Sequence, residues 1–201
     1  MTEKNFLALR GVQTPEIQVE LLEKQTVFAG GSKYIDADDE LLQIANWIKS
    51  NTEHNKDIKP ERIKYLYTTN VKKDGGRYVL GNLSLRTDVE KMVNDEYDYI
   101  LFIHYKSWKE LDIENKVIQL DKILCGVDID IDNKTKKYPA DSKEYTSNLR
   151  CYGEAKVLNS SEMIDTVVER ITNQEKEERK NKKENIKEQR DEVPVIPESQ
   201  I

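Results

Sequence analysis

The segment that most constrains the fold is the apolar run Tyr99–Ile103, which reads YILFI. Consecutive apolar residues, rich in β-branched and aromatic side chains, are typical of a strand that is covered on both faces. The next segment, Asp112–Gly126, has a helical pattern, in which Asp112 can cap the start and Gly126 can end the helix in a left-handed turn. One face of this helix collects the apolar residues Ile113, Val117, Leu120 and Leu124. We therefore predict a central buried strand followed by an amphipathic helix.

Another helix is predicted over residues 36–51, upstream of that strand. Acidic residues load its first turn, where Asp36 or Asp38 can act as the cap, and they suit the positive end of the helix dipole. Its apolar face consists of Leu41, Ile44, Ala45 and Ile48, flanked by Leu42 and Trp47. Near the N-terminus, Pro15 predicts the first turn of a short helix, whose apolar stripe would be Ile17, Leu21 and Leu22.

Two strands are predicted between these helices. Residues 62–69 alternate β-branched and aromatic side chains, and residues 77–86 repeat the pattern with an irregularity at Gly81 and Asn82. The glycines Gly75 and Gly76 between them are a turn signal. We therefore expect residues 62–69 and 77–86 to pair as a hairpin.

The C-terminal region combines a helix with a charged tail. Residues 160–174 form a helical pattern that Ser160 or Ser161 can cap, and their apolar stripe is Met163, Ile164, Val167, Val168 and Ile171. From residue 175 to residue 190 nearly every side chain is charged or polar, so this part has no face to bury. We predict one α+β domain over residues 1–171 and a flexible charged tail over residues 172–201.

The charge and the cysteine usage exclude several classes of protein. The net charge of −6 disfavours nucleic-acid binding, which needs clustered Lys and Arg. No signal peptide and no stretch of about 20 apolar residues is visible, so we expect a cytoplasmic protein without a membrane partner. The two cysteines, Cys125 and Cys151, indicate no disulfide framework, and Cys125 is expected to be a buried thiol in the helix.

The sequence contains no recognisable catalytic or metal-binding motif. A zincin helix needs two histidines four residues apart with a glutamate after the first, whereas the only histidines here are His54 and His104. A structural zinc site built from these histidines with Cys125 and Cys151 has no spacing that would constrain it. We therefore predict no catalytic residues, no metal site and no cofactor.

An acidic repeat is the other candidate for metal binding. Asp128, Asp130 and Asp132 alternate with isoleucines, but a calcium loop of the EF-hand type needs Gly at its sixth position and Glu at its twelfth. Asn133 and Pro139 occupy those positions. We prefer a short strand or turn with one acidic face.

Four segments together resemble a known family. They read LLQIANWI, RIKYLYTT, EYDYILFIHYKSWKELD and VIQLDKILCGV, and they lie between about Asp36 and Val127. In this order the chain resembles the metallopeptidases encoded by phages and related elements. The resemblance implies a zincin-like core in which a small sheet lies between helices, followed here by the C-terminal helix.

The resemblance also implies that the catalytic motif has been lost. The family's final helix reads HELCH or close to it, which places the first metal ligand on Lys122, the general base on Ile123 and the second ligand on Gly126. None of these side chains can do that chemistry at neutral pH. The scaffold positions Leu120, Asp121, Leu124 and Cys125 are kept. We therefore expect no enzyme; Lys122 either pairs with an acid near the former metal position or is an ordinary surface lysine.

A scaffold of this kind without catalysis is expected to act by binding. In length and charge-rich character the chain is also similar to staphylococcal phage proteins that bind the primary sigma factor and alter host RNA polymerase. That similarity implies a partner in the host transcription machinery, with inhibition or redirection of host transcription, and it identifies no binding surface. Trp47 and Trp108 could anchor an interface, although core positions are preferred. The alternatives are a metal-dependent hydrolase rebuilt around acids and His104, and a phage structural or accessory protein.

Overall fold

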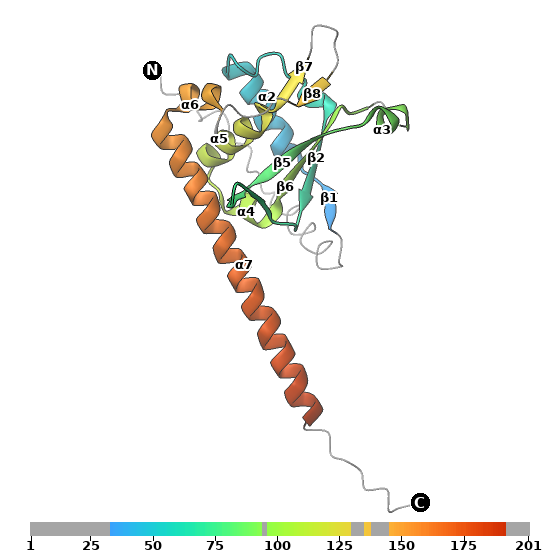
Figure 1. The fold of residues 1–201 in the computed structure, drawn as a ribbon, viewed down its shortest axis with the longest axis vertical. Coiled ribbons are helices and arrows are strands. Elements are labelled where there is room, and N and C mark those ends of the chain that lie inside the picture. Colours follow the sequence, from blue (N-terminus) through green and yellow to red (C-terminus); the bar gives the residue numbers. More distant parts are fainter. Residues whose placement is uncertain (1–32, 94–95, 130–134, 138–144, 192–201) are drawn as a thin grey trace, which may run out of the picture.

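The computed structural model describes residues 33–93, 96–129, 135–137 and 145–191, and it confirms the predicted α+β class (Figure 1). The predicted short helix near Pro15, as well as Asp130 and Asp132, lie outside the described residues. In chain order the elements are β1 (Tyr34–Asp36), α2 (Asp39–Asn51), the 3-10 turn η2 (Pro60–Arg62), β2 (Ile63–Thr68), β3 (Lys72–Asp74), β4 (Arg77–Val79), β5 (Gly81–Leu85), α3 (Asp88–Val93), β6 (Tyr99–His104), α4 (Tyr105–Glu110), α5 (Ile113–Leu124), β7 (Val127–Ile129), β8 (Thr135–Lys137), α6 (Thr146–Tyr152) and α7 (Glu154–Asp191).

The main sheet has four strands in the order β1-β2-β6-β5, so the apolar run identified from the sequence is a central strand. Strand β6 pairs in parallel with β2 and antiparallel with β5. Its inward residues Tyr99, Leu101 and Ile103 are buried, while Ile100 and Phe102 on the other face are only half-buried. The prediction of full burial on both faces was therefore wrong for one face of β6.

The predicted hairpin between residues 62–69 and 77–86 was also wrong. Strand β6 lies between the two segments, because β2 pairs with β6 instead of with its neighbour in sequence. The turn at Gly75 and Gly76, with φ angles of +54° and +85°, instead closes the short hairpin of β3 and β4. The chain then bends at Leu80 and enters β5 at Gly81, where a Cβ atom would collide with the Phe102 carbonyl oxygen. The irregularity at Gly81 is thus the point where the chain passes from the β3–β4 hairpin into the four-stranded sheet.

Three helices complete the core. Most residues of the predicted apolar faces of α2, α5 and α7 are buried together with the inward side chains of β2, β5 and β6, whereas Ile113 and Met163 are half-buried. Burying a single Leu or Ile side chain stabilises a fold by about 1.5–3 kcal/mol. The fully covered helix residues are Leu41, Ile44, Ala45 and Ile48 of α2, Val117, Leu120 and Leu124 of α5, and Ile164 and Val168 of α7. Trp108 is also fully buried and Trp47 is half-buried against this core, as expected for core residues.

The helix ends agree with the sequence only in part. The Asp112 carboxylate caps α5 by accepting a hydrogen bond from the Asn115 backbone N–H at 2.8 Å, as predicted. Asp38 is the N-cap residue of α2, but its carboxylate accepts from the Tyr67 hydroxyl instead of from the helix. The predicted left-handed turn at Gly126 was wrong, because α5 ends at Cys125 in a right-handed conformation and the chain turns directly into β7.

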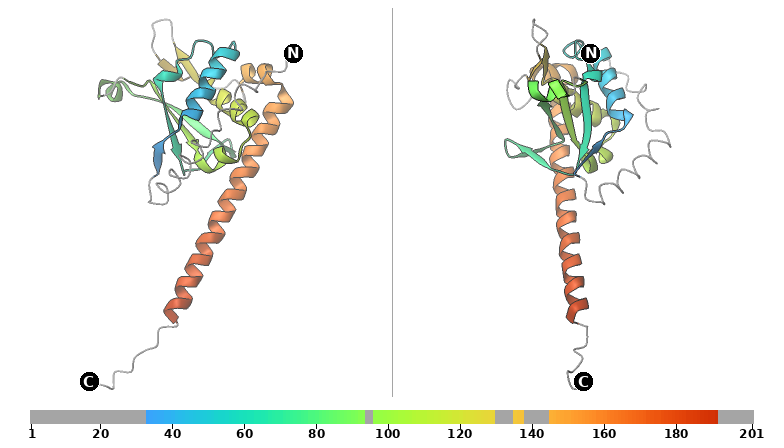
Figure 2. Two further views of the ribbon diagram at one scale, coloured as in Figure 1. Left: turned by 180° about the vertical axis from the view of Figure 1, so that it is seen from behind. Right: turned by 90° about the vertical axis from the view of Figure 1, so that its right-hand side faces the viewer.

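Helix α7 is longer than the sequence pattern predicted. It begins at Glu154, directly after Gly153 with a φ angle of +90°, so Ser160 and Ser161 lie inside it and cap nothing. Among the side chains described on α7, Ile171 is the last buried one, and the helix continues as a rod to Asp191 (Figure 2). The predicted flexibility of residues 172–201 stays a prediction. Within the described residues, no helix combines the length and apolar character that a bilayer crossing requires.

Candidate metal centre

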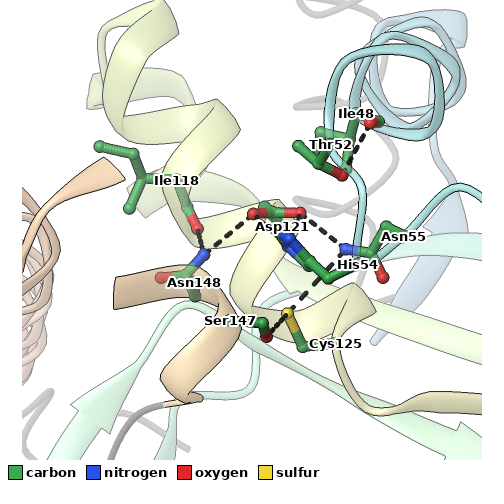
Figure 3. Close-up of polar contacts among 9 residues, drawn as sticks. All are labelled: Ile48, Thr52, His54, Asn55, Ile118, Asp121, Cys125, Ser147 and Asn148. Atoms are coloured by element: carbon green, nitrogen blue, oxygen red, sulfur yellow. Dashed lines mark hydrogen bonds and ion pairs between the residues drawn. The ribbon is translucent and has the colours of Figure 1, made fainter. Parts of the chain in front are cut away.

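A buried carboxylate, Asp121 of α5, lies at the centre of a polar group of side chains (Figure 3). Nε2 of His54 lies 3.1 and 3.0 Å from its two oxygens. The side-chain amide of Asn55 donates to Oδ1 at 2.6 Å, and that of Asn148 donates to Oδ2 at 3.0 Å. We call the set His54, Asn55, Asp121, Cys125, Ser147, Asn148 and Cys151 the Asp121 cluster.

The Asp121 cluster is assembled from three segments that are distant in sequence. Helix α2 ends at Thr52, whose hydroxyl and backbone N–H both donate to the Ile48 carbonyl at 2.9 Å, and the following loop carries His54 and Asn55 (Figure 3). Helix α6 supplies Ser147, Asn148 and Cys151, and it packs against α5. The loop after α2 and helix α6 therefore meet at one position of α5.

The register of α5 decides which of its residues reach the cluster. Residues four apart lie on the same face of a helix, and the pair that faces the cluster is Asp121 and Cys125. Ile123 packs against the apolar core, and Gly126 lies against the Tyr145 hydroxyl and the Leu83 side chain. The resemblance placed the two metal-ligand positions on Lys122 and Gly126. Each of these lies one residue after a member of the pair, Asp121 and Cys125, that faces the cluster.

Lys122 points away from the Asp121 cluster. Its ammonium donates to the Ser161 hydroxyl of α7 at 3.3 Å, and the side chain is half-buried. Both interpretations of Lys122, the pairing with an acid and the surface lysine, stay predictions.

The second cluster residue of α5 is a neutral thiol. Burial first, and then the negative charge of Asp121, raise the pKa of the Cys125 thiol to about 12. Its Sγ lies 3.6 Å from the Ser147 hydroxyl and 3.9 Å from the Asn55 amide nitrogen. The same two causes raise the pKa of the neighbouring Tyr152 hydroxyl. Cys125 is half-buried, which corrects the expectation of a thiol enclosed in the apolar core.

Three members of the cluster have the donor atoms of a metal site. A ring nitrogen of His54, a carboxylate oxygen of Asp121 and the sulfur of Cys151 all lie within 4.8 Å of one another. Zinc bonds to these atom types are about 2.0–2.3 Å long, so neighbouring donors on a tetrahedral ion are about 3.5 Å apart. The donor set thus fits the metal of a metallopeptidase fold, although it contains neither two histidines nor a glutamate.

The sequence could have revealed only part of this centre. The spacing of Asp121 and Cys125 on one helical face was available, whereas nothing in the sequence connects His54 or Cys151 with that face. The other histidine, His104, is not part of the cluster: it is buried at the end of β6, with Nδ1 2.7 Å from the Ser107 hydroxyl. A rebuilt site around His104 therefore receives no support from the Asp121 cluster.

A different buried carboxylate lies nearer the start of α5. Glu40 of α2 accepts from the ammonium of Lys116 at 2.8 Å and from Nε1 of Trp108 at 2.7 Å. All three side chains are buried, and the ammonium lies 5.0 Å from the centroid of the Trp108 ring. We call these three residues the Glu40 cluster.

Comparison with known proteins agrees with the resemblance read from the sequence. No curated protein and no solved structure matches the chain. Residues 32–173, more than two thirds of the chain, match the family described as "Putative phage metallopeptidase". This span begins just before β1 and ends inside α7, so it contains the whole sheet and both polar clusters. The chain therefore belongs to the putative phage metallopeptidase family.

Proposed function

We propose that this family member does not hydrolyse peptides and acts by binding another protein. The claim that the protein does not hydrolyse peptides rests on the residue that follows Asp121. If Asp121 stands at the first ligand position of a zincin helix, Lys122 stands where the water-activating glutamate is needed. A lysine that points to α7 supplies no carboxylate to that centre.

Asp121 is itself a poor substitute for the missing base. A carboxylate takes a proton from water only through an accessible lone pair. Here the carboxylate is fully buried, and both of its oxygens accept hydrogen bonds from His54, Asn55 and Asn148. Its geometry is that of a fixed acceptor.

The second half of the proposal rests on the surface of α3. This helix exposes three large apolar side chains, Val89 at 71%, Met92 at 88% and Val93 at 85% of their full area. Neighbouring exposed apolar side chains are typical of protein-binding surfaces, and the flexible Met side chain adapts to a partner. We name Val89, Met92 and Val93 the α3 patch. We propose that it anchors the partner, because Trp108 is buried in the core and Trp47 is half-buried against it.

The first partner to test is the host transcription machinery, in the cytoplasm of the infected cell. This choice rests on the similarity in length and charge-rich character to phage proteins that bind the primary sigma factor. The family match does not bear on it. A protein partner, and not DNA, also suits a chain of net charge −6.

Hydrolysis is tested with the purified full chain, zinc and a mixed panel of fluorogenic peptides. We expect no turnover above that of the Cys151→Ser variant. Zinc-dependent turnover that is present in the wild-type chain and absent in Cys151→Ser would overturn the first half of the proposal and favour the rebuilt hydrolase.

Binding is tested by calorimetry with the purified primary sigma factor and with RNA polymerase holoenzyme. We expect a complex whose Kd rises at least about tenfold in the Val89→Asp/Met92→Asp double variant, because hot-spot side chains contribute about 1–2 kcal/mol or more each. Val71→Asp is the matched control, since Val71 is another exposed valine outside the α3 patch. If the chain forms a complex with neither protein, this partner is excluded. If the double variant binds as tightly as the wild type, the α3 patch is excluded as the binding surface.

A further inference from the structure

We infer that the Asp121 cluster is a zinc site, in which a ring nitrogen of His54, the Asp121 carboxylate and Cys151 Sγ hold one ion. This goes beyond the proposed function and differs from the sequence-based expectation of no metal. That expectation rested on positions 122 to 126 of the helix and on the unconstrained spacing of the histidines and cysteines, whereas the structure directs Asp121 to the centre and brings His54 and Cys151 to it.

The three donor atoms lie close together although each comes from a different segment of the chain. His54 lies in the loop after α2, Asp121 on α5 and Cys151 near the end of α6, and their ligand atoms are within 4.8 Å of one another. A shift of about 1 Å or less brings such atoms to the spacing of about 3.5 Å that a tetrahedral zinc ion sets. An ion at this position would therefore join three segments that are otherwise held by side-chain hydrogen bonds.

Neighbouring side chains already hold the central ligand in place. Asn55 and Asn148 each donate to a different oxygen of Asp121, which fixes the plane of the carboxylate. The double hydrogen bond of Thr52 to the Ile48 carbonyl fixes the start of the loop that carries His54. Metal ligands in proteins are typically oriented by such an outer shell of hydrogen bonds.

The donor chemistry selects zinc. Imidazole nitrogen and thiolate sulfur favour zinc over magnesium and calcium, which prefer all-oxygen sites. The charges also balance, because the two positive charges of the ion meet one carboxylate and one thiolate. On binding, the Cys151 thiol transfers its proton to solvent, and the neutral His54 ring coordinates through the nitrogen that carries no proton. The resulting site is neutral, which suits a position where Asp121 is buried and His54 and Cys151 are half-buried.

Cys125 lies beside the site and provides the matched control. Its sulfur contacts Asn55 and Ser147, and it does not belong to the group of three donors. Cys125→Ser and Cys151→Ser make the same chemical change on two half-buried cysteines. Only the second removes a proposed ligand, so the pair separates metal coordination from general loss of a thiol.

The test is elemental analysis of the untagged full chain after it is prepared in zinc and freed of excess ion. We expect one zinc per chain in the wild type and in Cys125→Ser, and much less than one in Cys151→Ser and in His54→Gln. Loss of an outer-shell partner typically weakens metal binding about 10- to 100-fold. Loss of a direct ligand should weaken zinc binding by more than that. Circular dichroism and gel filtration identify any variant that fails to fold.

Two further measurements keep the inference falsifiable if a variant does not fold. Cobalt in place of zinc should give a sulfur-to-metal charge-transfer absorption in the wild type, and zinc should raise the Tm by about 5–10 °C at about a hundred times its Kd. Absence of zinc and of any Tm shift overturns the inference, as does equal loss of zinc in Cys125→Ser and Cys151→Ser. Bound zinc with peptide turnover contradicts the proposed function alone, and no zinc with no turnover contradicts the zinc site alone.

Discussion

The Glu40 and Asp121 clusters each contain a buried carboxylate and a residue of α5, but they surround the carboxylate with different partners. Glu40 faces the ammonium of Lys116 and the N–H of Trp108, neither of which offers a lone pair to a metal. Asp121 faces an imidazole and two amides, with the sulfur of Cys151 close by. The Glu40 carboxylate is therefore neutralised by the protein itself, whereas the Asp121 carboxylate is surrounded by groups that can share a metal ion.

The difference separates a structural cluster from a ligand-binding one. A closed ion pair with buried partners is expected to matter for folding and for nothing else. A carboxylate that is hydrogen-bonded by amides and lies beside a His and a Cys can bind a metal cation. The two clusters share one helix, so variants in each can be compared in the same fold.

The largest effect is expected from breaking the Glu40 cluster. Lys116→Met leaves the Glu40 carboxylate buried without its counter-charge, which should lower the free energy of unfolding by about 3–5 kcal/mol. Urea unfolding measures the loss. In the double variant Glu40→Leu/Lys116→Met, which removes both charges, most of the loss should be recovered. A double variant as unstable as the single one would show that the pair is not the cause.

The next largest effect is expected from Asp121→Ala. The change leaves the side chains of His54, Asn55 and Asn148 without their acceptor, and we expect a loss of about 2–4 kcal/mol in urea unfolding. The two clusters should respond differently to metal. With zinc present the loss caused by Asp121→Ala should grow, and with a chelator it should shrink, while the loss caused by Lys116→Met should stay constant. A zinc-independent loss at both positions would remove the distinction between the clusters.

Much of this fold could be predicted from sequence, because helix faces and apolar strands are local patterns. The stripes of α2, α5 and α7 and the central position of β6 all follow from the spacing of apolar residues. Strand partners could not be predicted, because the parallel pairing of β2 with β6 joins residues about 36 positions apart and the turn at Gly75 suggested a local hairpin. Pairing over such separations is decided by packing and leaves no local mark.

The same reasoning explains what was missed at the two clusters. Glu40 lay in the acidic first turn of α2 and was read as a partner of the helix dipole, yet it is 1% exposed and pairs across to α5. The helix face of Asp121 was visible, but its partners come from a loop and from the short α6, which had no predicted pattern. Tertiary proximity, and not residue type, made both clusters.

A smaller effect is expected at His104, whose Nδ1 lies 2.7 Å from the Ser107 hydroxyl, whereas Nε2 of His54 lies 3.0 Å from the Asp121 carboxylate. Burial lowers the pKa of His104 to about 4, against a weaker opposing effect of Glu175. Because the unfolded chain takes up the proton near pH 6.5, stability should fall as the pH drops from about 6.5 to 4, by up to about 3 kcal/mol. Urea unfolding across that range measures the slope, and His104→Gln should remove this part of it. An unchanged slope in His104→Gln would assign the pH dependence to other groups.

The smallest effect is expected at the second lysine of α5, which sharpens the comparison within one helix. The Lys122 ammonium contacts a neutral hydroxyl on α7 and is half-buried, whereas that of Lys116 is sealed against a carboxylate. A hydrogen bond of this kind contributes about 0.5–1.5 kcal/mol, so Lys122→Met should cost about 1 kcal/mol or less in urea unfolding. Ser161→Ala should cost a similar amount, and the double variant Lys122→Met/Ser161→Ala should cost less than the sum. A loss in Lys122→Met comparable with that in Lys116→Met would mean that Lys122 neutralises a buried acid, as the sequence suggested for the former metal position.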